Sequence, residues 1–138
     1  MNTCELFDEA TQTWKYVASL TTARHGAAAA TLNDKVYIFG GYGRQCLDSV
    51  EEYDSAANEW TLLPVQLSGP RSHCAGALVN GRIYVCGGQN SSVVESFEAS
   101  EMRISSVAVL PKVMFGAAAV SLPVSDDFYR QLFGSSQS

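Results

Sequence analysis

The sequence has little charge, few histidines and no long apolar run. Charged residues make up 17% of the 138 residues, and histidine occurs only twice. No apolar stretch approaches the roughly 20 residues that a membrane-spanning helix needs. The opening segment MNTCELFDEA lacks the basic region and the apolar core of a secretory signal. We therefore expect an intracellular protein with reduced thiols, in the cytoplasm or, as the alternative, the nucleus.

Patterns for metals and cofactors are also missing. The two histidines, His25 and His73, have no carboxylate cluster beside them. The cysteines form no CxxC pair and have no zinc-ligand spacing; they are Cys4, Cys46, Cys74 and Cys86. We expect no metal and no cofactor. Cys74 and Cys86 fall in expected strands and are interpreted as small buried hydrophobic residues.

Catalytic patterns are equally scarce. There is no G-x-S-x-G elbow. Ser72 and His73 are adjacent, so on one strand their side chains would point to opposite faces and could not act as nucleophile and base. Cys46 would be reactive only if the nearby Arg44 favoured its thiolate. The Gly-Gly doublets at 40–41 and 87–88 are followed by neither a helix pattern nor a lysine, which argues against a phosphate loop. We expect no enzymatic activity.

The composition favours a folded domain with a protein partner. Apolar residues make up 46% of the chain, which is enough to bury a core. The net charge is −5 and the sequence pI is about 4.9. This negative charge disfavours nucleic acid or an anionic membrane as the main partner. It weakly favours a basic protein segment.

Two stretches of the chain repeat one another. RHGAAAATLNDKVYIFGG (24–41) aligns without a gap on RSHCAGALVNGRIYVCGG (71–88), at an offset of 47 residues. SVEEYDSAANEW (49–60) repeats CELFDEATQTW (4–14), and VVESFEASEMRI (93–104) is a third copy. We assign a structural role to the recurring positions Tyr37, Tyr84, Gly40, Gly41, Gly87, Gly88, Trp14 and Trp60. Such a period indicates an array of stacked supersecondary units.

Each unit is predicted to contain four short strands. GAAAATL and CAGALV are rich in small residues, which suits the crowded inner wall of a radial array. VYIF and IYVC carry the β-branched and aromatic residues of a second strand, and SVEEYD alternates with period two. Asn80-Gly81 is the strongest short hairpin signal between the first two strands, and Asn33-Asp34 is its weaker counterpart. The fourth strand, EWTLL, is expected to bury Trp60 between blades.

A starting arginine, a tyrosine before the Gly-Gly doublet and a late tryptophan resemble the Kelch repeat, whose period is about 50 residues. A WD40 array, the nearest alternative, would show Gly-His and Trp-Asp pairs at places where this sequence has none. The resemblance covers residues 4–122 and implies an all-β fold of four-stranded propeller blades. The expected boundaries are the outer strands of a first blade at 4–23, a second blade at 24–63, a third at 71–110, and the inner strands of a degenerate blade at 112–138.

These strands amount to about three blades, whereas propellers typically close with about 4 to 8. Either a longer chain supplies the other blades, or two chains meet head to tail in a six-bladed homodimer with two-fold symmetry. The last unit is the weakest. It starts at Lys112 without an arginine, continues with VMFGAAAVSL (113–122) as a first strand, and has FYRQLFGS (128–135) as a degenerate second strand.

The resemblance also implies a ligand face. In Kelch receptors this face is the rim formed by the loops from second to third strand and from fourth to next first strand. Arginine brings a five-donor fork and tyrosine a rigid amphipathic ring, both typical of interface hot spots. The candidate partner-binding residues on this rim are Tyr42, Arg44, Gln45, Gln89, Asn90, Ser91, Arg24 and Arg71.

The expected function is a non-enzymatic protein–protein interaction module. The resemblance implies substrate recognition for a cullin-type ubiquitin ligase, which normally needs a BTB or other adaptor domain that the sequence does not show. One alternative is an actin-binding or oligomeric scaffold. The other is a fragment of a Kelch-fold enzyme such as a copper-radical oxidase, which would use His25, His73, Tyr42 and Cys46.

Overall fold

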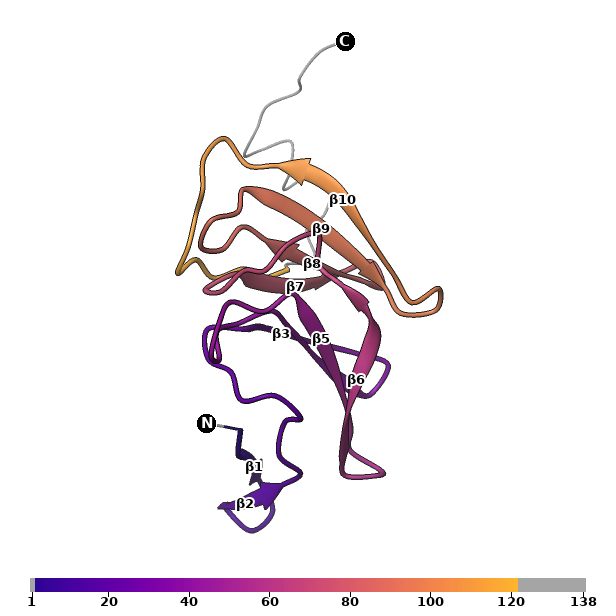
Figure 1. Ribbon diagram of the computed structural model, residues 1–138. Coiled ribbons are helices and arrows are strands. Elements are labelled where there is room, and N and C mark those ends of the chain that lie inside the picture. The colour runs from indigo at the N-terminus through magenta and orange to yellow at the C-terminus, as the bar shows by residue number, and fades with distance from the viewer. Residues whose placement is uncertain (1, 122–138) are drawn as a thin grey trace, which may run out of the picture.

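The computed structural model describes residues 2–121, and every regular element within them is a β-strand. No helix in this part of the chain could span a membrane. The strands form three antiparallel sheets, one of two strands and two of four (Figure 1). Their bounds are β1 (Cys4–Asp8), β2 (Thr13–Val17), β3 (Ala28–Leu32), β4 (Lys35–Phe39), β5 (Ser49–Asp54), β6 (Glu59–Gln66), β7 (Ala75–Val79), β8 (Arg82–Cys86), β9 (Val93–Glu98) and β10 (Arg103–Val109).

Each four-stranded sheet is a meander in which every strand pairs with the next in sequence. The hairpins between first and second strands have left-handed backbones at both central residues. The φ angles are 52° and 62° at Asn33 and Asp34, and 48° and 76° at Asn80 and Gly81. Type I′ turns require positive φ at both of these positions. The predicted hairpins and the all-β fold of four-stranded propeller blades are confirmed.

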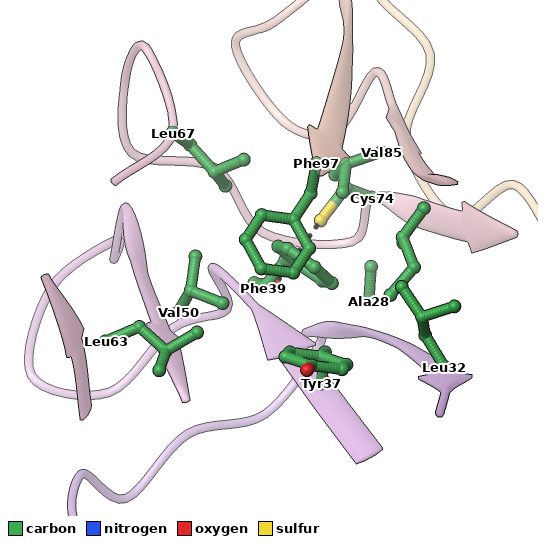
Figure 2. Packing of buried hydrophobic residues seen from close by; sticks show 11 residues of the cluster. Ala28, Leu32, Tyr37, Phe39, Val50, Leu63, Leu67, Cys74, Val85 and Phe97 are labelled. Atoms are coloured by element: carbon green, nitrogen blue, oxygen red, sulfur yellow. Dashed lines mark hydrogen bonds between the residues drawn. The ribbon is translucent and has the colours of Figure 1, made fainter. Parts of the chain in front are cut away.

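The hydrophobic core lies between the two four-stranded sheets. Their first strands, β3 and β7, are in contact, and a Cβ built on Gly76 would lie only 3.2 Å from the Cβ of Ala28. Small residues therefore allow the sheets to converge at this inner wall, as predicted. Farther out, Phe97 of β9 packs on Tyr37 and Phe39 of β4, with ring centroids 5.2 and 5.5 Å apart (Figure 2).

The late tryptophans occupy equivalent places but differ in burial. In the cross-strand pair Tyr53–Trp60 the ring centroids are 5.1 Å apart, and in Phe7–Trp14 they are 5.2 Å apart. Trp60 is 8% exposed and its Nε1 donates to the carbonyl oxygen of Ala18 at 3.0 Å. The expected burial of Trp60 is confirmed. Trp14 is 65% exposed, because the N-terminal hairpin has no further strands beside it among the described residues.

The prediction of a first strand at 113–122 is wrong for residues 113–121, which form no strand. The described part of the chain ends at residue 121. A strand needs a hydrogen-bonded neighbour, and the predicted one at 128–135 lies outside the described residues. The segment nevertheless docks in register. Gly88 N donates to Met114 O at 2.7 Å, as Gly41 N donates to Arg71 O at 2.8 Å. Met114, and not Lys112, therefore takes the place of the starting arginine.

Candidate partner-binding rim

The Gly-Gly doublet fixes one end of each rim loop to the frame. Gly40 and Gly41 are buried, with φ angles of 62° and 101°. A Cβ on Gly40 would lie 2.5 Å from the carbonyl oxygen of Arg71. Gly41 N–H donates to that same oxygen at 2.8 Å. The doublet therefore ties the end of β4 to the linker that enters the next sheet, and only glycine fits there.

The other end of each loop is fixed by a backbone hydrogen bond. The first loop (residues 42–48) ends at Asp48, whose carbonyl oxygen accepts from Leu67 N at 2.9 Å. The second loop (residues 89–92) ends at Ser92, whose carbonyl oxygen accepts from Leu110 N at 2.7 Å. Loops of different length therefore span equivalent anchor points.

Arg24 lies beneath the first loop. Its side chain is 1% exposed, and its Nη2 lies 2.6 Å from Oε1 of Glu51. Its Nη1 donates to the carbonyl oxygen of Gly40 at 2.7 Å. The carboxylate of Glu51 also accepts from the backbone N–H groups of Thr21 and Thr22, at 2.8 and 3.1 Å. This hydrogen-bonded ion pair joins a linker, a doublet and a strand.

Arg71 repeats this arrangement in the second sheet. Its side chain is 1% exposed, and its Nη2 lies 2.5 Å from Oε2 of Glu95. Both arginine side chains are buried, because each guanidinium is enclosed by its own linker and third strand. The prediction that Arg24 and Arg71 present free guanidinium forks to a partner is therefore wrong. They hold the rim together from below.

The other candidate residues reach solvent. Tyr42, Arg44, Gln45, Gln89 and Asn90 are exposed, and Ser91 is half-buried. Tyr42 is held by paired backbone hydrogen bonds with His25, at 2.8 and 2.9 Å. Arg44 makes no ion pair with any residue that the structure describes. The first loop thus presents an aromatic ring, a free cation and an amide close together.

An aromatic cluster that the sequence did not predict joins the two units on this rim. The ring centroid of His25 lies 5.5 Å from that of Tyr42 and 6.2 Å from that of His73. His73 has a φ of 54° and occupies the place of Gly26 in the preceding unit, and its imidazole packs over Gly26. Within residues 2–121 no group of three or more His, Cys, Asp or Glu could hold a metal ion. The cluster offers two imidazoles and a phenol to a ligand.

Ser72 and His73 contact each other, contrary to expectation. Nδ1 of His73 lies 3.2 Å from Oγ of Ser72. The predicted separation fails because both residues precede β7 and the positive φ of His73 turns its side chain back. Ser72 is 0% exposed, and its hydroxyl also donates to Oε1 of Gln89 at 3.2 Å. In this geometry the serine is enclosed, and the contact orients the imidazole.

The thiols near the rim differ in environment. Cys74 is buried, as predicted, and burial raises the pKa of its thiol. Cys86 is half-buried, and desolvation raises the pKa of this thiol too. Cys46 is half-buried, with Sγ 3.8 Å from Oγ of Ser72. Cys46 therefore belongs to the seam between the two loops.

Two equivalent pockets open on the rim. The first has a volume of about 590 Å³ and lies between the linker 21–25 and the loop that carries Tyr42 and Arg44. The second has a volume of about 420 Å³ and lies between the linker 68–71 and the loop that carries Asn90 and Ser91. Each sheet therefore builds one pocket from its own linker and loop.

Charge is divided unevenly between the two ends of the sheets. The linkers and loops of the rim contain four Lys or Arg and one Asp, over residues 21–26, 42–48, 68–73, 89–92 and 110–116. The opposite turns contain seven Asp or Glu and three Lys or Arg, over residues 8–13, 33–35, 54–59, 80–82 and 98–103. Two of the rim cations are neutralised by buried glutamates. The rim is thus close to neutral, and most of the negative charge lies at the other end.

Fold and rim together define a protein of β-propeller blades with an open loop surface suited to binding. The Kelch motif matches residues 23–64 and 70–99, which is more than half of the chain. The chain belongs to the Kelch-repeat family.

Similar proteins agree with this assignment. The chain is 42% identical to human Kelch-like protein 4 over 57 residues, covering 41% of this chain and 8% of that protein. It is 34% identical to Kelch-like protein 7 of Rattus norvegicus over 76 residues, covering 54% and 13%. It is 36% identical to F-box/kelch-repeat protein At1g67480 of Arabidopsis thaliana over 70 residues, covering 49% and 18%. The matches thus span less than a fifth of each of these relatives.

The solved structure of YjhT superposes with a TM-score of 0.65 at 19% identity. The match covers 72% of this chain and 42% of that one. At this identity the likeness shows the fold alone. The family and the relatives support a Kelch-repeat protein-interaction module.

Proposed function

We propose that this chain is a non-enzymatic interaction module whose rim holds a segment of a partner protein. The observation that carries the proposal is the placement of exposed Tyr42, Arg44 and Gln45 on a loop whose two ends are fixed to a buried frame. Binding residues typically lie on loops that a rigid scaffold positions. Tyrosine and arginine are the residues most enriched at energetic hot spots.

The local charge defines the kind of segment that fits. The chain as a whole is acidic, but seven of its 14 acidic residues lie in the turns opposite the rim, and the rim loops hold one. On the rim itself Arg44 is a cation without an ion-pair partner among the described residues, and Asp48 is the one carboxylate in its loops. Complementary charge favours encounter. A neutral or acidic segment therefore suits the rim better than a basic one.

The finer proposal is substrate recognition for a cullin-type ubiquitin ligase in the cytoplasm. Such a role needs an adaptor domain joined to the Kelch repeats. The Arabidopsis relatives are named for an F-box as well as for Kelch repeats, so repeats of this kind do occur beside a second domain. The propeller would then supply the substrate-binding surface.

The test compares the parent protein with two variants. The rim variant is Tyr42→Ala with Arg44→Ala, and the matched control at the opposite turns is Asp34→Asn with Glu59→Gln. Each is used as bait for crosslinking in cells, and the identified partner is then purified and titrated by biolayer interferometry. We expect the rim variant to bind about 30-fold more weakly, as for a hot-spot loss of about 2 kcal/mol. The control should bind like the parent.

Two outcomes would contradict the proposal. If the control loses binding and the rim variant does not, the partner binds the opposite end. If the partner is a substrate of a ubiquitin ligase, the parent should copurify with a cullin, and ubiquitylation of the partner should fall in the rim variant. Unchanged ubiquitylation with lost binding would reject the ligase role and leave the interaction module intact.

Self-association is a separate prediction. A head-to-tail homodimer would appear in sedimentation of the 138-residue chain as a discrete species of twice 14.8 kDa. Deleting residues 123–138 should abolish it. A monomer would exclude a stable homodimer.

A further inference from the structure

The hairpin between β7 and β8 carries an asparagine followed by a glycine at its tip. Asn80 and Gly81 are both exposed and belong to the turns opposite the rim. Within residues 2–121, a Cβ built on Gly81 would have no atom within 4 Å, and the nitrogen of Gly81 makes no backbone hydrogen bond. Water and a dissolved base therefore reach the peptide bond between the two residues directly.

This pair holds the groups of an intramolecular reaction. The backbone nitrogen of Gly81 becomes a nucleophile once a base has removed its proton, and Cγ of the Asn80 side-chain amide is the electrophile. Both belong to the same short stretch of chain, so their attack forms a five-membered ring without any encounter step. Glycine favours this ring because it has no Cβ to crowd it and its backbone adopts conformations that other residues rarely adopt.

The turn has to open locally before the ring can close. Asn80 and Gly81 have φ angles of 48° and 76° in the folded chain, and ring closure requires the Asn80 carbonyl group to rotate out of the type I′ conformation. The tips of exposed turns open at a much lower free energy than core strands do. We therefore expect the reaction in the folded chain, but more slowly than in the unfolded chain.

The equivalent hairpin of the first sheet lacks this reactivity. The chain has five asparagines, and glycine follows only Asn80. Asn33 occupies the same turn position as Asn80, but Asp34 follows it. The carboxylate of Asp34 disfavours a negatively charged backbone nitrogen beside it. The two hairpins thus share a backbone conformation and differ in the residue that supplies the nucleophile.

The remaining asparagines are restrained in other ways. Oδ1 of Asn58 accepts from Ala18 N and from the hydroxyl of Tyr53, both at 2.9 Å. The nitrogen that follows Asn90 donates to the carbonyl oxygen of Gly88 at 3.2 Å. A β-branched threonine follows Asn2 and crowds the nitrogen there. Their side chains and following residues therefore make these positions less reactive than Asn80.

We propose that Asn80 is a site of deamidation in the folded chain. A bond forms between the backbone nitrogen of Gly81 and Cγ of Asn80, the bond from Cγ to Nδ2 breaks, and ammonia leaves with a proton returned by the base. Water then opens the resulting succinimide at either of its two carbonyl carbons. The product at position 80 is aspartate or isoaspartate.

The two products have different consequences for the second sheet. Either one adds a negative charge to turns that are already acidic. Isoaspartate also adds a methylene to the backbone of a two-residue loop, and the length of such a loop fixes the register of its hairpin. The pairing of Val79 with Arg82 lies directly beside the loop, and β7 contacts β3 of the first sheet. Isoaspartate therefore weakens the inner wall between the sheets, whereas aspartate leaves the backbone unchanged.

The test follows each asparagine in its own tryptic peptide. Cleavage after lysine and arginine releases Asn80 in residues 72–82 and Asn33 in residues 25–35. The folded 138-residue chain and a urea-unfolded sample are kept in mildly alkaline buffer made with heavy-oxygen water, and are then digested in ordinary water at mildly acidic pH. Mass spectrometry counts only the conversions that took up heavy oxygen before digestion. We expect conversion of residues 72–82 in both samples, while residues 25–35 of the folded chain stay intact.

A reciprocal exchange of the two turns isolates the residue that follows each asparagine. Asp34→Gly should create conversion at Asn33, and Gly81→Asp should abolish it at Asn80. Each variant receives a turn sequence that the other unit already folds with positive φ at both positions. Far-UV circular dichroism of both variants checks that the sheets are intact, so that a change in conversion reports the chemistry of the turn.

Several results would overturn the proposal. One is an Asn80 that stays intact in the folded chain while it converts in urea, because the turn then protects it. Equal conversion at Asn33, Asn58 or Asn90, or an Asp34→Gly variant with an unreactive Asn33, would reject the assigned cause. The effect on the sheet is measured on chains separated by ion exchange, with Asn80→Asp as the control that lacks the added methylene. The isoaspartate form should unfold at lower urea than this control, and equal midpoints would reject the weakening of the inner wall.

Discussion

The two tryptophans provide a matched pair for testing the packing of the blades. They occupy the same place in successive units, but Trp60 is 8% exposed and Trp14 is 65% exposed. Trp60→Ala removes a buried indole that packs on Tyr53 and leaves the carbonyl oxygen of Ala18 without its donor. Truncations of this kind cost about 3–5 kcal/mol. Trp14→Ala removes a mostly solvated ring and should cost less than about 1 kcal/mol.

Urea denaturation of the 138-residue chain, followed by far-UV circular dichroism, measures both changes. A domain of this size is stable by about 5–15 kcal/mol, so the Trp60 variant should unfold at clearly lower urea with an unchanged slope. Trp14→Ala leaves Trp60 as the chain's one tryptophan, and its fluorescence should follow the same transition. Equal losses from the two substitutions, or a loss below about 1 kcal/mol at Trp60, would refute the packing argument.

Three further substitutions test the frame beneath the rim and the core between the two sheets. Gly40→Ala should lower the free energy of unfolding by about 2 kcal/mol or more, because a Cβ at positive φ would lie 2.5 Å from a carbonyl oxygen. Gly69→Ala, with open space around it, is the control in the same denaturation experiment, and equal losses would contradict the clash. Glu95→Ala should cost about 3–5 kcal/mol because it leaves Arg71 buried and unpaired. The double change with Arg71→Met should recover part of that loss, and no recovery would reject the ion pair as its cause. Burial raises the pKa of Tyr37, so on alkaline titration the unfolded chain loses this phenol proton first and stability falls as the pH rises through about 10. Tyr37→Phe should flatten the fall, and identical pH profiles would contradict that assignment.

The blades could be predicted because their signals are local. Asn80-Gly81 specifies a type I′ hairpin through the conformations that its own residues allow, and the strands beside it alternate or carry β-branched residues. The repeat then extended the prediction to the weaker Asn33-Asp34 turn. Nothing beyond neighbouring residues was needed at either place.

The rim was harder, because its chemistry depends on contacts between distant residues. Arg24 and Arg71 were expected at the surface, but Glu51 and Glu95 on the third strands draw them inward. The available signal was a Val-Glu pair that recurs in both third strands with each arginine. The neighbouring rings of His25 and His73 could not be predicted from sequence, since the contact requires both the packing of the sheets and a left-handed backbone at His73.

Each rim loop is fixed to the frame at two anchor points, and these points separate the loop's own residues from the contacts that hold the sheets together. Between the Gly-Gly doublet and the residue that accepts from Leu67 or Leu110, one loop has residues 42–48 and the other has residues 89–92, yet the sheets on either side keep the same hydrogen bonds. Insertions and substitutions between the two anchor points leave the supporting contacts intact. The surface that each loop presents can therefore change independently of the other loop, by natural variation or by design, while the fold stays the same.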